Sequence, residues 1–269
     1  TWPMSPLALG ALAAYLTATV ASRLPGQRER HGLAAAWWWL GMFALALHAV
    51  LHYTRWQALG GVDLHFFAAL SLVTAAMSAI TLLLGVNRDS SLLAIVAFPI
   101  AALMLGLYAL FGKPTPTPAT QDWRITLHAA IALLAYATLN MAALVAIVLF
   151  VQERALRARR LGDWMLGFPP LVLVERLLFQ LIAVGFALLT ATLLTGVLFV
   201  EDLFAQHLVH KTVLSIAAWL VFGVLLLGRW RWGCRGRRAV NLTLAGMALL
   251  VLGFVGSKFV LELVLQRAG

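Results

Sequence analysis

The residues in this sequence with the clearest capacity for chemistry are its seven histidines. A neutral imidazole is a common ligand for haem iron and for several other metals, because one ring nitrogen keeps a lone pair. His48 and His52 are four residues apart, so on a helix they share one face and can serve one site. The structural alternative is that one imidazole bonds a backbone carbonyl while the other lies at a polar interface.

His128 begins a stripe of small side chains at helical spacing. The stripe continues through Ala132, Ala135, Leu139, Ala142 and Ala146. Small residues let another helix or a flat cofactor approach closely. Helix packing alone explains the alanines but not the histidine at the end of the stripe, so we interpret His128 as a ligand candidate.

The elements that position these residues are expected to be membrane-crossing helices. Hydrophobic residues make up 62% of the chain and charged residues 11%, whereas a soluble domain carries about 25% charge. A span of ~30 Å of hydrocarbon takes roughly 20 apolar residues. We therefore predict an all-α, polytopic transmembrane helix bundle that forms one integral membrane domain over residues 1–269. Its eight expected spans are 4–22, 32–53, 64–86, 91–111, 125–151, 176–200, 211–228 and 240–264. The first span has no small-residue cleavage site and is expected to be retained.

Lysine and arginine predict the orientation of these spans. The loops after spans one, three, five and seven hold 14 basic residues, and the opposite loops with the C-terminal tail hold 5. The richest is the five-arginine cluster between Arg229 and Arg238. Basic loops prefer the cytoplasmic side, so both termini are predicted to lie outside.

In this orientation the histidines divide unequally across the membrane. Only His31 falls on the cytoplasmic side. The other six fall in the outer half of the membrane or in the outer loops: His48, His52, His65, His128, His207 and His210. This clustering suggests a shared site near the outer face. His65, which follows Asp63, is interpreted as an interfacial residue.

The last span carries Lys258 and Glu262, one helical turn apart. Ionisable residues inside a span are costly and are usually functional or paired. Lys258 is a candidate for binding an anionic group such as a propionate. Alternatively, both side chains reach the interface and act as anchors.

Other residues exclude some chemistry and anchor the spans. Cys234 is the only cysteine, which excludes a disulfide, a CxxC redox pair and covalent haem attachment at CxxCH. The basic residues lie in short clusters between apolar runs, so membrane orientation, and not nucleic-acid binding, accounts for the net charge of +10. Trp37, Trp38, Trp39 and Trp123 lie near span ends and are predicted to anchor in the interface.

Three segments resemble the cytochrome c assembly family of membrane proteins. Residues 210–259 are similar to the C-terminal part of the family and read HKTVLSIAAWLVFGVLLLGRWRWGCRGRRAVNLTLAGMALLVLGFVGSKF. Residues 127–150 are similar to its histidine-containing helix with a tyrosine eight residues on, here His128 and Tyr136. Residues 169–196 also fit. The resemblance covers roughly 125–260 and is closest to the YpjD-like branch. It implies a multi-pass protein of the bacterial inner membrane that binds haem through histidines near the outer face.

The chain departs from the family at its tryptophan-rich WWD signature. In haem-handling members this signature lies on the outer loop and contacts haem, and it should precede Lys211. Residues 202–211 instead read DLFAQHLVHK, without a tryptophan. His210 stands where the signature would end, which makes it a candidate replacement ligand.

From the residues and the resemblance together, we expect non-covalent haem b as the cofactor. His128 would be one axial ligand of the iron, with His210 or His48 as the other. Other cofactor-binding candidates are His52, His207 and Lys258. The expected partners are the lipid bilayer, haem and a membrane or periplasmic protein of haem-enzyme assembly. Two other functions stay open: a non-catalytic accessory subunit that has the fold without haem, and a transporter of a small solute or metal ion. No catalytic residue is identified.

Overall fold

The computed structural model describes residues 5–24, 35–61, 63, 65–86, 91–112, 122–158, 170–199 and 209–256. All regular elements in these ranges are helical, and each of the eight expected spans contains one long helix, which confirms the predicted all-α class. The elements are α1 (Pro6–Arg23), α3 (Ala36–Leu59), α4 (Phe66–Gly85), α5 (Ser91–Phe111), α6 (Trp123–Arg157), α7 (Leu171–Phe199), α8 (Val209–Trp232), α9 (Arg237–Val251) and the π-helical turn η3 (Leu252–Gly256).

The helices α4 to α8, and α9 together with the first residues of η3, are each long and apolar enough to cross a membrane. The 35-residue α6 exceeds the length that the hydrocarbon core requires, so it extends beyond the core. Among the described helices, α1 and α3 do not reach this apolarity over a window of spanning length. The chain is thus a polytopic helix bundle of the membrane. The placement of both termini outside stays a prediction based on the basic loops.

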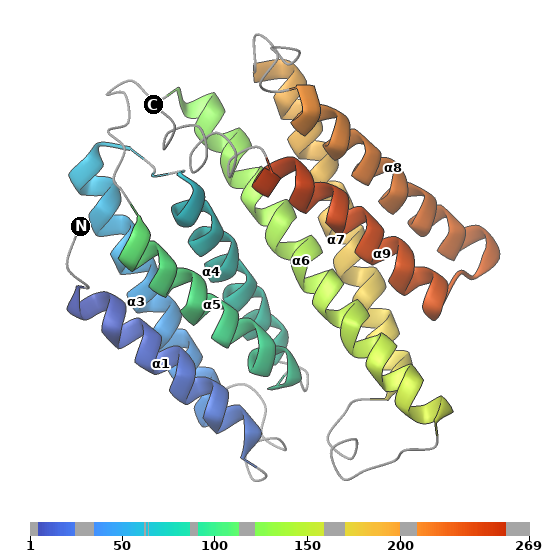
Figure 1. Ribbon diagram of the computed structural model, residues 1–269, viewed down its shortest axis with the longest axis horizontal. Helices are drawn as coiled ribbons and strands as arrows, with labels where there is room; N and C mark the ends of the chain where they lie inside the picture. The colour runs from blue at the N-terminus through green and yellow to red at the C-terminus, as the bar shows by residue number, and fades with distance from the viewer. Residues whose placement is uncertain are drawn as a thin grey trace. The chain divides into compact units, whose positions relative to one another are not determined.

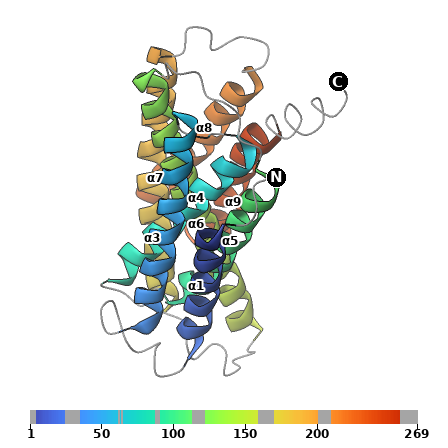
Figure 2. The same cartoon turned by 90° about the vertical axis from the view of Figure 1, so that its left-hand side faces the viewer.

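The helices group into two compact units, residues 1–122 and 123–269. In unit 1, α1 packs against α3 and α5, and α4 packs against α5 and α3 (Figures 1 and 2). In unit 2, α6 and α7 pack along each other, while α9 contacts α6 and α8 (Figure 1). That residues 1–269 form one integral membrane domain stays a prediction.

Aromatic side chains fill part of the core of unit 1. Tyr15, Trp37 and Phe98 are buried, and the ring of Phe98 lies 5.6 Å from Tyr15 and 6.4 Å from Trp37, between centroids. Gly41 makes this contact possible, because a Cβ at that position would lie 2.6 Å from Cζ of Phe98. The core therefore joins α1, α3 and α5, the helices that carry part of the site.

The tryptophan run at the start of α3 divides between core and surface. Trp37 is buried, and Trp38 donates its indole N–H to the carbonyl oxygen of Leu82 at 2.9 Å. Trp39 is exposed. Consecutive helical residues point in directions about 100° apart, so the three rings cannot all face outward. The predicted anchoring role is wrong for Trp37.

The alanine stripe of α6 is a helix-packing surface. Ala135, Ala142 and Ala146 are buried. On α7, Gly185 allows close approach, because a Cβ there would lie 2.5 Å from Cδ2 of Leu139. Packing therefore accounts for the small residues of the stripe, but not for His128 at its end.

A partly buried ion pair connects α7 and α8 at the end of unit 2 that holds the basic cluster. Arg229 donates to Oε1 of Glu175 at 2.7 Å and also to the carbonyl oxygen of Cys234 at 3.3 Å. Its guanidinium lies 4.6 Å from the ring centroid of Phe179. Arg229, one of the arginines that predict the membrane orientation, thus also stabilises the contact between α7 and α8.

Candidate functional site

His48 and His52 lie in a polar cluster inside unit 1. Both project from one face of α3, with ring centroids 5.3 Å apart. Ser71 of α4 bonds both rings: its Oγ lies 2.8 Å from Nε2 of His48 and 3.0 Å from Nε2 of His52. The shared face is confirmed. The partner of the two rings is a side-chain hydroxyl of α4, whereas the structural alternative expected a backbone carbonyl.

His48 uses both of its ring nitrogens. The ring is fully buried, and its Nδ1 lies 3.2 Å from the hydroxyl of Tyr15 on α1. With Nε2 on Ser71, ligation of iron by His48 would require one of these hydrogen bonds to break. Its role as a ligand stays a prediction.

Replacing Ser71 by alanine is expected to destabilise the protein. Nε2 of His48 would then be buried without a partner, which costs about 1–3 kcal/mol. Thermal unfolding of the purified protein in detergent measures the effect. Thr54→Ala is the matched control, because Thr54 bonds only the carbonyl of Leu51 in its own helix. Equal losses of melting temperature in the two variants would contradict the assigned role of Ser71.

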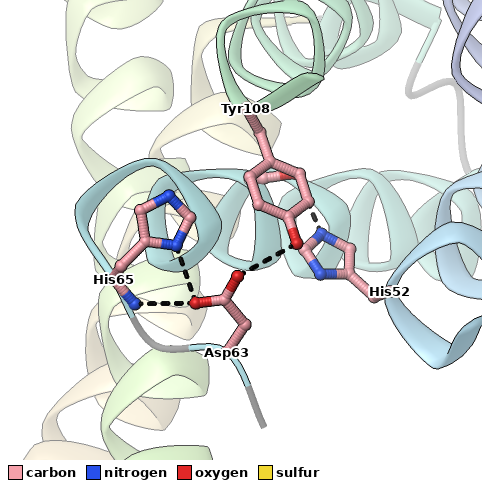
Figure 3. Close-up of polar contacts among 5 residues, drawn as sticks. His52, Asp63, His65 and Tyr108 are labelled. Carbon is pink, nitrogen blue, oxygen red and sulfur yellow. Dashed lines mark hydrogen bonds and ion pairs between the residues drawn. The ribbon is translucent and has the colours of Figure 1, made fainter. Parts of the chain in front are cut away.

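A second polar group lies where the chain passes from α3 to α4. The carboxylate of Asp63 is buried, and its Oδ1 accepts hydrogen bonds from the backbone N–H of His65 at 3.2 Å and from ring Nδ1 at 2.7 Å. Its Oδ2 accepts a hydrogen bond from the hydroxyl of Tyr108 on α5 at 3.3 Å (Figure 3). An aspartate that bonds the backbone N–H two residues on is a common turn-forming arrangement, and α4 begins directly afterwards.

The hydrogen bonds at Asp63 keep its carboxylate charged at neutral pH. Burial by itself raises the pKa of Asp63, but the hydrogen bonds and charge of His65 and the hydroxyl of Tyr108 hold the pKa below its usual value of 3.8. A cation lies in the same region: Arg55 is buried, and its guanidinium carbon is 4.8 Å from the ring centroid of Tyr108. The group thus holds one buried charge of each sign.

His65 is half-buried, and its predicted interfacial position stays a prediction. Only 9% of its side chain is exposed, since the ring folds back onto Asp63. Its second nitrogen, Nε2, is buried and has no hydrogen-bond partner among the described residues. Figure 3 shows this nitrogen on the side of the ring away from Asp63.

Ring contacts join the two polar groups. The ring of Tyr108 stacks on His52 with centroids 4.9 Å apart and planes 3° from parallel. It also lies 5.6 Å from the ring of His65. Figure 3 shows Tyr108 between the two histidines. We call the combined set the unit 1 polar cluster; it consists of Tyr15, His48, His52, Arg55, Asp63, His65, Ser71 and Tyr108.

In unit 2, His128 lies near the start of α6 and is half-buried. Its Nδ1 is 2.9 Å from Oγ1 of Thr195 on α7. That hydroxyl has one hydrogen, which it donates to the backbone carbonyl of Ala191 at 2.8 Å. While that hydrogen is donated to the carbonyl, the oxygen accepts the N–H of His128 and the lone pair lies on Nε2; in the other tautomer of the ring the hydroxyl donates to Nδ1. A metal-binding imidazole has the first arrangement, with one nitrogen donating to the protein and the other free for the metal.

The other predicted site residues are described only in part. His210 lies in the first turn of α8, which begins at Val209, at the same end of unit 2 as His128. The side chain of His210 lies outside the described residues, as do His207, Lys258 and Glu262. Their roles stay predictions. Within the described ranges, no three His, Cys, Asp or Glu side chains are arranged to hold a metal ion.

Tyr136, two helical turns after His128, connects α6 with α9. Its hydroxyl donates to the carbonyl oxygen of Leu250 at 3.1 Å, and its ring lies 5.2 Å from that of Phe254. The contact falls where α9 passes into the π-helical turn η3. Such turns are frequent at functional sites because they change the hydrogen-bond register of the helix.

Comparison with known proteins identifies the family. The sequence matches the family described as Cytochrome C assembly protein over residues 37–265. The chain belongs to the cytochrome c assembly protein family. The predicted resemblance, which rested on residues 125–260, is thereby confirmed and extended into unit 1.

Two curated relatives are similar to this chain over most of their length. The inner membrane protein YpjD of Escherichia coli K12 is 33% identical over 269 residues, which cover 97% of this chain and all of the relative. An uncharacterized 28.8 kDa protein of Azospirillum brasilense is 37% identical over 205 residues, which cover 74% of this chain and 73% of the relative. No solved structure matches. The apolar helices and the inner-membrane relative identify this cytochrome c assembly family member as a multi-pass inner-membrane protein.

The sequence indicated the histidines but not their partners. Ser71 and Thr195 are hydroxyl residues inside apolar helices, and such residues occur in most of the spans. No pattern distinguished these two. A signal was present at Asp63, because a carboxylate two residues before a histidine at the start of a span can fix the ring of that histidine.

Proposed function

We propose that this protein binds non-covalent haem b through His128 and handles or delivers it near the outer face of the inner membrane. The observation that supports the proposal is the hydrogen bond from His128 to Thr195. It fixes the ring and, with Nδ1 as the donor, leaves the Nε2 lone pair available, as an axial ligand of haem iron requires.

The residues of unit 2 are suitable for haem. Haem iron takes one protein ligand on each face, so a single prepared imidazole is a useful contribution, whereas a bare metal ion would need several donors. His128 would hold the iron, Thr195 would orient the ring, and haem would supply the redox-active metal. The half-buried position of His128 suits a group that must enter and leave. His210 or His48 is the predicted second axial ligand.

The second candidate is a non-catalytic accessory subunit of haem-enzyme assembly that has the family fold but binds no haem. Its support is the sequence of residues 202–211, where the tryptophan signature of haem-handling members is absent. The two candidates differ in one observable property, the binding of haem by the isolated protein.

An absorption spectrum tests the proposal. Protein purified in detergent and titrated with haemin is expected to develop a Soret band that saturates at a fixed ratio of haem to protein. Titration of detergent micelles alone is the control, because haem also partitions into micelles. If the protein adds nothing to the micelle spectrum, the accessory-subunit candidate is preferred and the haem proposal fails.

A further inference from the structure

We infer that the turn between α8 and α9 binds the phosphate headgroup of an anionic phospholipid, such as phosphatidylglycerol. The inference does not depend on the proposed haem function. It is based on three features of this end of unit 2: exposed arginines without an acidic partner, a turn that places them at the start of α9, and an apolar stripe of α8 that leads to them.

The first feature is an excess of positive charge at this end of unit 2. Arg229 pairs with Glu175, and Glu153 at the end of α6 pairs with Arg157. Four further arginines are exposed and form no ion pair with another described residue: Arg231, Arg235, Arg237 and Arg238. Exposed guanidinium groups without a counter-charge attract anions, and they suit phosphate because each can donate two parallel hydrogen bonds to it.

The turn that carries these arginines has a defined backbone, and Figure 1 shows how short the connection between α8 and α9 is. Gly233 ends α8 with a φ of 64°, and its N–H donates to the carbonyl oxygen of Arg229 at 3.1 Å. The side chain of Arg229 also donates to the carbonyl oxygen of Cys234 at 3.3 Å. Gly236 lies against α6, because a Cβ there would be 2.9 Å from Oε1 of Glu153. The backbone that presents the arginines is therefore held at both ends of the turn.

The second feature is the position of two arginines in the first turn of α9. This helix begins at Arg237, and Arg238 follows. The N-terminus of a helix carries partial positive charge, so acidic or capping residues are favourable there and cations are not. Gly236 at the N-cap has no side chain, and the first turn contains no acidic residue. A phosphate at this position would interact with the arginines and with backbone N–H groups of the first turn.

The third feature favours a phospholipid over a free anion. Four exposed apolar side chains recur at helical spacing along one side of α8: Val213, Leu220, Val224 and Leu227. Arg231 lies four residues after Leu227, so it continues the same side of the helix. Trp230 and Trp232 flank it, with 83% and 74% of their surface exposed, as is typical of tryptophans at the membrane interface. Acyl chains that lie along the stripe would place the headgroup at the arginines.

A comparison of headgroups tests the inference on the wild-type protein. Protein freed of copurified lipid is titrated in detergent with phosphatidylglycerol or phosphatidylcholine, and thermal unfolding is followed. A ligand that binds only the folded state raises the melting temperature. Phosphatidylglycerol is expected to raise it saturably, and phosphatidylcholine is not. Equal effects of the two lipids would overturn the inference.

A soluble headgroup analogue separates a lipid from a free anion. Glycerol 3-phosphate has the phosphate but no acyl chains, so it is expected to give no shift at the concentration at which phosphatidylglycerol saturates. An equal shift with this compound would mean that the turn binds free phosphate compounds, and the assignment to a lipid would be wrong.

Substitutions locate the binding surface. Arg231→Gln and Arg237→Gln are each expected to weaken phosphatidylglycerol binding by about 5-fold, and together by about 25-fold. The other arginines of the cluster remain, so the charge signal that predicts the membrane orientation is retained. Arg124→Gln is the matched control, because it removes an exposed arginine at the opposite end of α6. An equal loss in Arg124→Gln would show that net charge alone attracts the lipid, and would overturn the inference, as would wild-type affinity in the double variant.

Discussion

Alanine in place of His128 is expected to lower the affinity of unit 2 for haem by more than about 100-fold. Changes to groups that only support a metal ligand typically cost about 10–100-fold, and loss of the ligand itself removes the bond to iron. The measurement is a haemin titration followed at the Soret band. The high-affinity part of the titration curve, which depends on His128, should disappear. The melting temperature should change little, because the ring is half-buried and contributes one hydrogen bond.

The hydroxyl of Thr195 provides a finer version of the same test. Thr195→Val keeps the shape of the side chain but removes the hydroxyl that bonds His128, so the ring loses its hydrogen bond to α7. Haem affinity is expected to fall by about 10–100-fold. Thr190→Val is the matched control on the same helix, because Thr190 accepts from Trp219 and has no contact with His128. Affinities that are equal in the wild type, Thr195→Val and His128→Ala would contradict the role given to the ring.

The fold could be predicted from sequence because its signal is strong and local. Each helix coincides with an apolar run of spanning length, and the ends differ by a few residues. Within the described ranges, the largest differences occur at charged ends: α3 continues past Arg55 to Leu59, α6 continues to Arg157, and α7 begins at Leu171. A helix does not stop where the hydrocarbon stops, so hydropathy alone places such ends poorly.

Packing between helices could not be predicted in the same way. The division into units 1–122 and 123–269 depends on which helices contact one another, and hydropathy carries no information on this. The burial of Trp37 depends on Phe98, about 60 positions later in the chain. The aromatic-belt rule describes tryptophans at span ends on average, and it cannot distinguish one that packs against a neighbouring helix.

The site shows the same limit at the level of single atoms. Imidazole chemistry directed attention to the histidines, and the spacing of His48 and His52 gave their common face correctly. Whether each ring has a free nitrogen depends on hydroxyl groups of other helices, such as Ser71 and Thr195. These hydrogen bonds occupy Nε2 of His48 and leave Nε2 of His128 open. The sequence could therefore suggest candidate ligands, but it could not rank them.

Alanine at Asp63 is expected to lower the free energy of unfolding by about 3–5 kcal/mol, as measured by denaturant or thermal unfolding in detergent. The carboxylate accepts from the backbone and ring of His65 and from Tyr108, and all three donors would lose their partner. Glu153→Gln is the control, since Glu153 pairs with the exposed Arg157 and such surface pairs contribute at most about 1 kcal/mol.

The acid dependence of stability separates the charge of Asp63 from its shape. The pKa of Asp63 in the folded protein lies below its usual value of 3.8, so its stabilising contribution is complete above that value and is lost as the pH falls through the folded pKa. Asp63→Asn removes the titrating group but keeps the volume of the side chain. The variant should therefore be less stable than the wild type at neutral pH, and the difference should shrink below about pH 4. A difference that stays constant down to pH 2 would mean that the carboxylate charge contributes nothing to the stability of the cluster.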